Sequence, residues 1–126
     1  MKFYIASALE NHASVSLAAT MLKNAGHTHT YDWTEHGSVQ RDGDARIAEV
    51  AANEIAGVWA ADVVIVLLPG GRGTHTELGV AIGAGKQVHV HGPMLDASGR
   101  TCAFYHAPNV TRHYGSIVTM LAAVNA

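Results

Sequence analysis

Short hydrophobic runs alternate along the chain with longer segments in which hydrophobic residues recur every three or four positions. The first pattern is typical of buried strands, and the second is typical of helices that pack on a sheet by one face. The run Val63–Leu68 is apolar at every position, as expected of a central parallel strand covered on both sides. The pattern predicts strands at 1–7, 27–33, 63–68, 87–91 and 110–114, and helices at 11–24, 44–60, 74–83 and from about 116.

Because strands and helices alternate with short connections, we expect one α/β domain over residues 1–126. The expected architecture is an open parallel sheet of about five strands flanked by helices, as in Rossmann-like and flavodoxin-like folds. Ligands of such sheets bind beyond the carboxyl ends of the strands. The loops after Ser7, Trp33, Leu68 and His91 should therefore frame the site.

The composition narrows the class of protein further. Of 126 residues, 48% are hydrophobic and 14% are charged, which excludes a disordered chain. The longest apolar run is six residues, far below the roughly 20 of a membrane helix. A net charge of −2 without a basic cluster argues against nucleic-acid binding. The absence of a signal-peptide pattern and the single Cys102 favour a cytoplasmic protein.

A glycine-rich turn, Pro69–Gly73, leads from the central strand into the third helix. Three of its residues are glycines, so backbone N–H groups can approach a ligand without an intervening side chain. Such groups at a helix start favour an anion, and Arg72 could grip the same anion. The turn matches neither the phosphate-binding loop of ATPases nor the dinucleotide fingerprint, and no cofactor is expected.

Two glutamates are candidates for chemistry near this turn. Glu77 lies at the start of the third helix, where a carboxylate could attack an acetal-like carbon; alternatively, it forms a capping box with Thr74. Glu54 falls inside the apolar stripe of the second helix, where a lone carboxylate is costly unless it lines a cavity; alternatively, a small rotation places it at the edge of the stripe. Together they could act as nucleophile and acid/base partner. The predicted stripe consists of Ile47, Val50, Ala51, Ile55 and Val58.

The other reactive residue types support no separate site. His89 and His91 share one face of a strand, as do His27 and His29, but no pattern supplies three or four zinc ligands. We therefore expect no metal. Cys102 has no neighbour in sequence that would activate its thiol.

Three segments of the chain resemble the nucleoside 2-deoxyribosyltransferase-like family, which includes nucleoside 5′-monophosphate N-glycosidases. The segments are Lys2–Ser7, Glu54–Asp62 and Gly73–Ala81, and the turn followed by Glu-Leu-Gly-x-Ala is the most specific. The resemblance implies an enzyme that acts at the anomeric carbon. Glu77 falls on the family nucleophile that attacks C1′, and Glu54 falls where the family usually has an Asp that handles the leaving base.

Tyr4 falls on a family tyrosine that orients the nucleophile. The resemblance places Ser7 and Trp33 in the walls of the sugar and base pockets, although residues such as Trp33 and Tyr31 are more often core residues than base-stacking platforms. The glycine turn falls at the sugar's 5′ end. Its expected substrate-binding residues are Gly70, Gly71, Arg72, Gly73 and Thr74.

The chain departs from the family pattern at three places. Glu54 is one methylene longer than Asp. Gly71 stands where transferases tend to have Asp and monophosphate hydrolases Ser, while the adjacent Arg72 would suit a 5′-phosphate. The family completes its site with a polar residue from a neighbouring subunit, which implies a homodimer or larger assembly, but the stretch from about Gly99 to His106 offers no clear counterpart.

The turn Pro69–Glu77 also resembles the P-G-G-x-G-T-x-x-E turn of cytokinin-activating phosphoribohydrolases. Those enzymes have longer chains and an upstream catalytic arginine, for which Arg46 is the nearest candidate. A non-catalytic nucleotide-sensing module is a third possibility. The base, the sugar, the need for a 5′-phosphate and the choice between transfer and hydrolysis stay open at this level.

Overall fold

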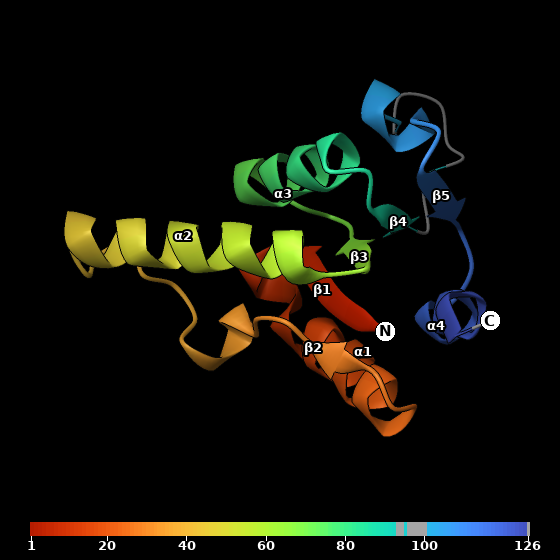
Figure 1. Ribbon diagram of the computed structural model, residues 1–126, viewed down its shortest axis with the longest axis horizontal. Coiled ribbons are helices and arrows are strands. Elements are labelled where there is room, and N and C mark those ends of the chain that lie inside the picture. The colour runs from red at the N-terminus through yellow and green to blue at the C-terminus, as the bar shows by residue number, and fades with distance from the viewer. Residues whose placement is uncertain (93–94, 96–100, 126) are drawn as a thin grey trace.

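The computed structural model describes residues 1–92, 95 and 101–125, which form one parallel β-sheet between two layers of helices (Figure 1). The strands lie in the order β2-β1-β3-β4-β5, and every neighbouring pair is parallel. The predicted open α/β sheet is therefore confirmed. The strands are β1 (Lys2–Ser7), β2 (Thr28–His29), β3 (Val63–Leu67), β4 (Gln87–His91) and β5 (Val110–His113).

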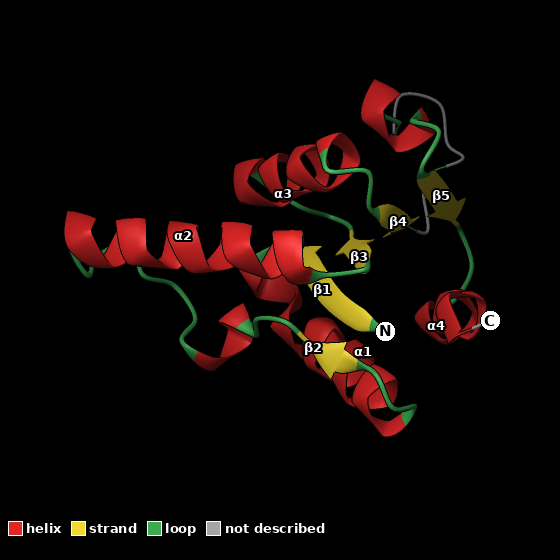
Figure 2. Ribbon diagram, viewed as in Figure 1, coloured by secondary structure: helices red, strands yellow, loops and turns green. Residues whose placement is uncertain are grey.

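The described residues also form four α-helices and three short 3-10 helices, all of which connect strands except α4, which follows β5 (Figure 2). In the view of Figure 1, α2 and α3 cover one face of the sheet, and α1 and α4 cover the other. No helix in the described part of the chain is both long and apolar enough to cross a membrane. The helices are α1 (His12–Asn24), α2 (Asp44–Ala60), α3 (Arg72–Gly83), α4 (Ile117–Asn125), η1 (Leu9–Asn11), η2 (Trp33–Glu35) and η3 (Ala103–His106).

The alternation of side chains along β1 decides which residues reach the site. Phe3 stacks on His29 at one face of the strand, with ring centroids 4.6 Å apart. Its neighbour Tyr4 points to the opposite face, towards α2 and α3, and is fully buried. Since β1 and β3 carry a continuous buried core around this position, Tyr4 is held on a rigid platform.

Two predicted element boundaries are wrong. The strand expected at 27–33 is paired only at Thr28 and His29, because Asp32 turns the chain by accepting hydrogen bonds from both the backbone N–H and the hydroxyl of Thr34. Trp33 consequently begins η2 rather than ending a strand. Helix α3 begins at Arg72, two residues earlier than expected, with Gly71 as its N-cap.

The apolar stripe predicted for α2 is also only partly buried. Val50 and Val58 face the core, whereas Ile47 is 38% exposed and Ile55 is 50% exposed. The helix is thus rotated from the predicted orientation, which leaves Glu54 at the border between core and solvent. In the view of Figure 1, the first turns of α2 extend beyond the strands of the sheet.

Candidate active site

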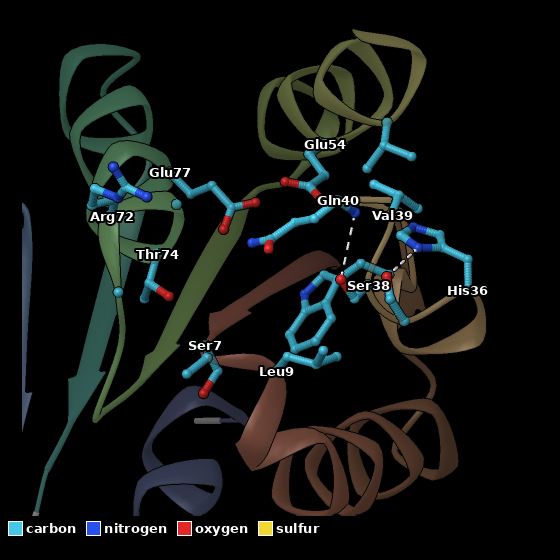
Figure 3. Close-up of a pocket in the computed structure, with 16 residues that line it drawn as sticks. Ser7, Leu9, His36, Ser38, Val39, Gln40, Glu54, Arg72, Thr74 and Glu77 are labelled. Atoms are coloured by element: carbon cyan, nitrogen blue, oxygen red, sulfur yellow. Dashed lines mark hydrogen bonds between the residues drawn. The ribbon is translucent and has the colours of Figure 1, made fainter. Parts of the chain in front are cut away.

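A cavity of about 430 Å³ lies beyond the carboxyl ends of β1 and β3 (Figure 3). The chain leaves β1 towards one face of the sheet and leaves β3 towards the other, so a crevice opens between the two connections, as the fold predicts. The cavity is lined by Ser7, Ala8, Leu9, Trp33, His36, Gly37, Ser38, Val39, Gln40, Val50, Glu54, Gly71, Arg72, Gly73, Thr74 and Glu77.

Glu77 projects from α3 into this cavity. The capping-box alternative is wrong, because Gly71 is the N-cap of α3 and no side chain caps the helix there. The carboxylate instead accepts a hydrogen bond from the Tyr4 hydroxyl. Burial raises the pKa of Glu77 well above the usual range of a carboxyl, the hydrogen bond from Tyr4 opposes the rise, and the nearby Glu54 adds to it.

Glu54 reaches the same cavity from α2 and is half-buried. Burial raises its pKa above the usual range, while a hydrogen bond with Glu77 and the nearby His36 lower it. Two carboxyls that line one cavity do not both ionise readily. The hydrogen bond between them raises the pKa of Glu77 and lowers that of Glu54, so Glu77 holds a proton more strongly than Glu54 does. Attack by Glu77 requires that this proton pass to Glu54, which leaves the carboxylate and the carboxylic acid that a nucleophile and a proton donor need.

Tyr4 lies beneath the cavity rather than in its wall. Its ring packs against α2 where Gly57 leaves room: a Cβ added to Gly57 would lie 3.1 Å from the Tyr4 ring and 2.9 Å from the Cβ of Tyr31. Burial raises the pKa of the Tyr4 phenol further above its usual value, and the neighbouring Glu77 carboxylate raises it again. The phenol therefore stays protonated and acts as a fixed hydrogen-bond donor to Glu77.

The glycine turn forms the rim opposite the two carboxyls. Gly71, Arg72 and Gly73 are exposed and line the cavity, as does the buried Thr74. Gly70 does not line it; its backbone packs so closely on Thr74 that an added Cβ would lie 2.4 Å from a side-chain carbon. The sequence-predicted binding residues of the turn are thus brought together, with Gly70 in a supporting position.

Hydrogen bonds to backbone carbonyls fix the floor of the cavity. The Ser7 hydroxyl donates to the carbonyl of Leu67, which joins the ends of β1 and β3. The Asn11 amide donates to the Ser7 hydroxyl and, at 2.9 Å, to the carbonyl of Pro69. Trp33 is nearly buried and donates its indole N–H to the carbonyl of Ile5 at 2.8 Å. Trp33 therefore belongs to the core and the cavity wall at once.

The loop after Trp33 closes the cavity on the side of α2, as predicted, but sequence reasoning did not identify its cavity-lining residues. His36, Ser38 and Gln40 line this side, and Figure 3 shows the Gln40 carboxamide pointing into the cavity. The ring of His36 is held at Nε2 by the Tyr31 hydroxyl, 2.7 Å away, and at Nδ1 by the carbonyl of Gly37. The only signal in the sequence was the position of the loop after the second strand.

Several other candidates lie away from the cavity. Arg46 is on the outer part of α2, where it pairs with Glu49 at 2.5 Å, so the arginine expected from the phosphoribohydrolase resemblance is not placed at the site. Within residues 1–92, 95 and 101–125, no group of His, Cys, Asp and Glu side chains could hold a metal ion. The loop after His91 and the start of the stretch at Gly99 fall largely outside the described residues.

Comparison with known proteins identifies the family of this chain. The family model described as nucleoside 2-deoxyribosyltransferase matches residues 3–108, which is most of the chain. The chain belongs to this family. The resemblance predicted from the sequence is thereby confirmed, and so is an enzyme of the nucleoside 2-deoxyribosyltransferase type. Family membership supports nucleoside deoxyribosyl transfer or N-glycosidic bond cleavage as the general activity.

Solved structures at low identity share the family fold. One is described as a 2-deoxyribosyltransferase from Bacillus psychrosaccharolyticus, with a TM-score of 0.70, 21% identity and 96% of each chain covered. Another is described as a CMP N-glycosidase from Clostridium botulinum, with a TM-score of 0.67, 13% identity and 100% of each chain covered. A conserved protein from Enterococcus faecalis has a TM-score of 0.56 and 21% identity, with 100% of this chain and 88% of that chain covered. No curated protein sequence gives a significant match.

Proposed function

We propose that the enzyme cleaves the N-glycosidic bond of a (deoxy)nucleoside or its 5′-monophosphate through a covalent glycosyl-enzyme on Glu77. The sugar then passes to another base or to water. The observation that carries this proposal is the contact of Glu77 with the Tyr4 hydroxyl and with Glu54 inside one cavity. A single carboxylate would serve many reactions, but a carboxylate oriented by a phenol and paired with a second carboxyl suits attack at an anomeric carbon.

In the first step, an ionised oxygen of Glu77 forms a bond to C1′ of the sugar. The bond between C1′ and the base nitrogen breaks, and its electron pair leaves with the base. The carboxylic acid of Glu54 supplies the proton that neutralises the leaving base. The products are a free base, an ester between Glu77 and the sugar, and an ionised Glu54.

In the second step, a nitrogen of another base or the oxygen of a water attacks C1′ from the side that the first base left. The ester bond breaks, Glu77 regains its electron pair, and Glu54 takes the proton from the attacking group. Two successive displacements at C1′ retain the configuration of the sugar. Tyr4 would hold the attacking oxygen of Glu77 in line throughout, because its hydroxyl donates to that carboxylate.

A trapped intermediate tests the role of Glu77. The wild-type protein is incubated with a panel of deoxynucleosides, ribonucleosides and their monophosphates, and base release is followed; the best substrate is then supplied as its 2-fluoro sugar analogue. We expect an intact-mass increase equal to one sugar, located at Glu77, and no increase in Glu77→Ala. Glu49→Gln is the matched control, because Glu49 is exposed on α2 and pairs with Arg46 away from the cavity.

Absence of base release from every member of the panel would refute the enzymatic proposal. Wild-type binding of a nucleotide by Glu77→Ala, together with that inactivity, would favour the nucleotide-sensing alternative instead. Addition of a second free base separates transfer from hydrolysis, since a transferase forms a new nucleoside. A comparison of each nucleoside with its monophosphate shows whether Arg72 at the rim receives a 5′-phosphate.

We also propose that the chain forms a homo-oligomer through α2. Three large apolar side chains on this helix are exposed, and Trp59 is the most exposed of them at 58%. Ile47 and Ile55 are spaced equally about Ala51, so a two-fold axis near Ala51 would bring Ile47 of one copy against Ile55 of the other. Mass measurement in solution should show a dimer or larger species that Ile55→Glu dissociates. A wild-type monomer at micromolar concentration would contradict this proposal.

A further inference from the structure

His75 links the glycine turn of the cavity to the C-terminal part of the sheet. The residue lies in the first turns of α3, two positions before Glu77, but it does not line the cavity. Its Nδ1 is 2.8 Å from the carbonyl oxygen of Gly71, and its Nε2 is 2.7 Å from the hydroxyl of Tyr105. The imidazole therefore spans from the N-cap of α3 to η3.

The chemistry of the two partners assigns the protons of this link. A carbonyl oxygen accepts but cannot donate, so Nδ1 of His75 must carry a hydrogen. In the neutral ring, Nε2 then accepts from the hydroxyl of Tyr105. Gly71 also accepts the backbone N–H of His75 at 3.2 Å, so one carbonyl at the rim is held by two donors of the same residue.

The far end of the link is rigid. Tyr105 is 5% exposed and belongs to the hydrophobic core. Its carbonyl oxygen accepts a hydrogen bond from the Arg112 guanidinium of β5 at 3.1 Å. At the near end, Gly71 and Gly73 have no side chains to anchor them, and a Cβ added to either would meet no neighbouring atom within 4 Å.

We propose that His75 and Tyr105 are positioning residues that hold the glycine turn in the shape that receives the sugar's 5′ end. This inference rests on the proposed function. Glycine backbones lose much conformational freedom when they are ordered. If the turn is already ordered before the substrate binds, this entropy loss does not lower the affinity for the substrate. The link would act on the ground state and the transition state alike, so its loss should raise KM and leave kcat nearly unchanged.

Isosteric variants of His75 test which half of the link matters. The amide nitrogen of Asn can take the place of Nδ1, whereas that of Gln extends towards the place of Nε2. We expect His75→Ala and His75→Gln to raise KM about tenfold, which corresponds to one hydrogen bond of ordinary strength. His75→Asn should raise KM only about threefold, because Asn keeps the bond to Gly71 but loses the bond to Tyr105. Tyr105→Phe should raise KM about threefold, and adding it to His75→Ala should have no further effect.

Thr76→Ala is the matched control, because the Thr76 hydroxyl also binds a carbonyl of the turn, that of Arg72, but has no bond to Tyr105. Its KM should stay within twofold of wild type. The proposal is overturned if His75→Ala leaves KM unchanged, if His75→Asn is as impaired as His75→Ala, or if kcat falls while KM stays constant.

Ring-nitrogen NMR of the unmodified protein tests the link without activity. We expect the hydrogen of His75 on Nδ1, and amide signals of Gly71 and Gly73 that shift in Tyr105→Phe. A hydrogen on Nε2 alone would overturn the link even if the enzyme is active. Conversely, a wild-type protein that releases no base refutes the proposed function, while the NMR result still decides whether the turn is held in this way.

Discussion

The contact between α2 and the ring of Tyr4 gives a direct test of how the site is positioned. The helix passes close to that ring at Gly57: a Cβ added there would lie 3.1 Å from the ring and 2.9 Å from the Cβ of Tyr31. Neither neighbour can rotate away easily, because Tyr4 is fully buried and the Tyr31 atom is next to the backbone. Gly57→Ala should therefore push Tyr4 away from the helix and disturb its bond to Glu77.

The expected magnitude has two opposing parts. Replacing a helical glycine with alanine stabilises the helix by about 1 kcal/mol. Overpacking a closely packed contact destabilises by about 1–3 kcal/mol. Gly57→Ala should then be destabilised by about 0–2 kcal/mol. The catalytic effect should be about tenfold in kcat/KM, since small displacements of a positioning group are costly.

Gly79→Ala is the matched control for this substitution. Gly79 lies within α3, and open space surrounds the position of its added Cβ. This variant should gain about 0.5–1 kcal/mol from helix propensity alone and keep wild-type kcat/KM. Because that gain is common to both variants, the difference in unfolding free energy isolates the overpacking of Tyr4 and should be about 1–3 kcal/mol. Denaturant unfolding measures the difference. The reasoning is refuted if the two variants are equally stable and Gly57→Ala is fully active.

Two further predictions concern the carboxyl pair and the glycine turn. Tyr4→Phe removes the hydrogen bond that lowers the pKa of Glu77, so the acidic limb of the profile of kcat/KM against pH should move to higher pH; Glu54→Gln removes a neighbouring negative charge and should move this limb to lower pH. Shifts in the same direction would show that Glu77 does not control the limb. Gly70→Ala would place a Cβ 2.4 Å from a carbon of Thr74 and should lower stability by about 1–3 kcal/mol in thermal unfolding, whereas an unchanged melting temperature would contradict the packing described for this turn.

Much of the fold followed from the sequence because periodicity reports burial. The fully apolar run at 63–68 contains β3, Val63–Leu67, in which every residue is buried, and the helical spacing at 44–60 is α2 to the residue. The orientation of α2 did not follow, since periodicity cannot distinguish a core face from a face left for other contacts. Ile47 and Ile55 belong to the latter.

The residues of the candidate site were also predictable only in part. Glu77, Glu54 and the turn were found because carboxylates and glycines at an expected ligand edge carry a chemical reason. The cavity-lining Ser38 and Gln40 were not found, because a loop without a repeating pattern reveals its side-chain directions only in three dimensions. His75 was missed because its partners, Gly71 and Tyr105, include one that is distant in sequence.

The raised pKa values of Glu54 and Glu77 also make the free energy of unfolding depend on pH. A carboxyl whose pKa is higher in the folded state than in the unfolded chain favours folding while protonated, and this contribution is lost as the pH rises through the folded-state pKa. Most paired carboxylates act in the opposite direction. The buried carboxyl pair therefore lowers the free energy of unfolding at neutral pH. Glu77→Gln should unfold at a higher temperature than wild type at neutral pH but not at pH 4. A residue that the proposed reaction requires thus reduces the stability of the core in which it lies.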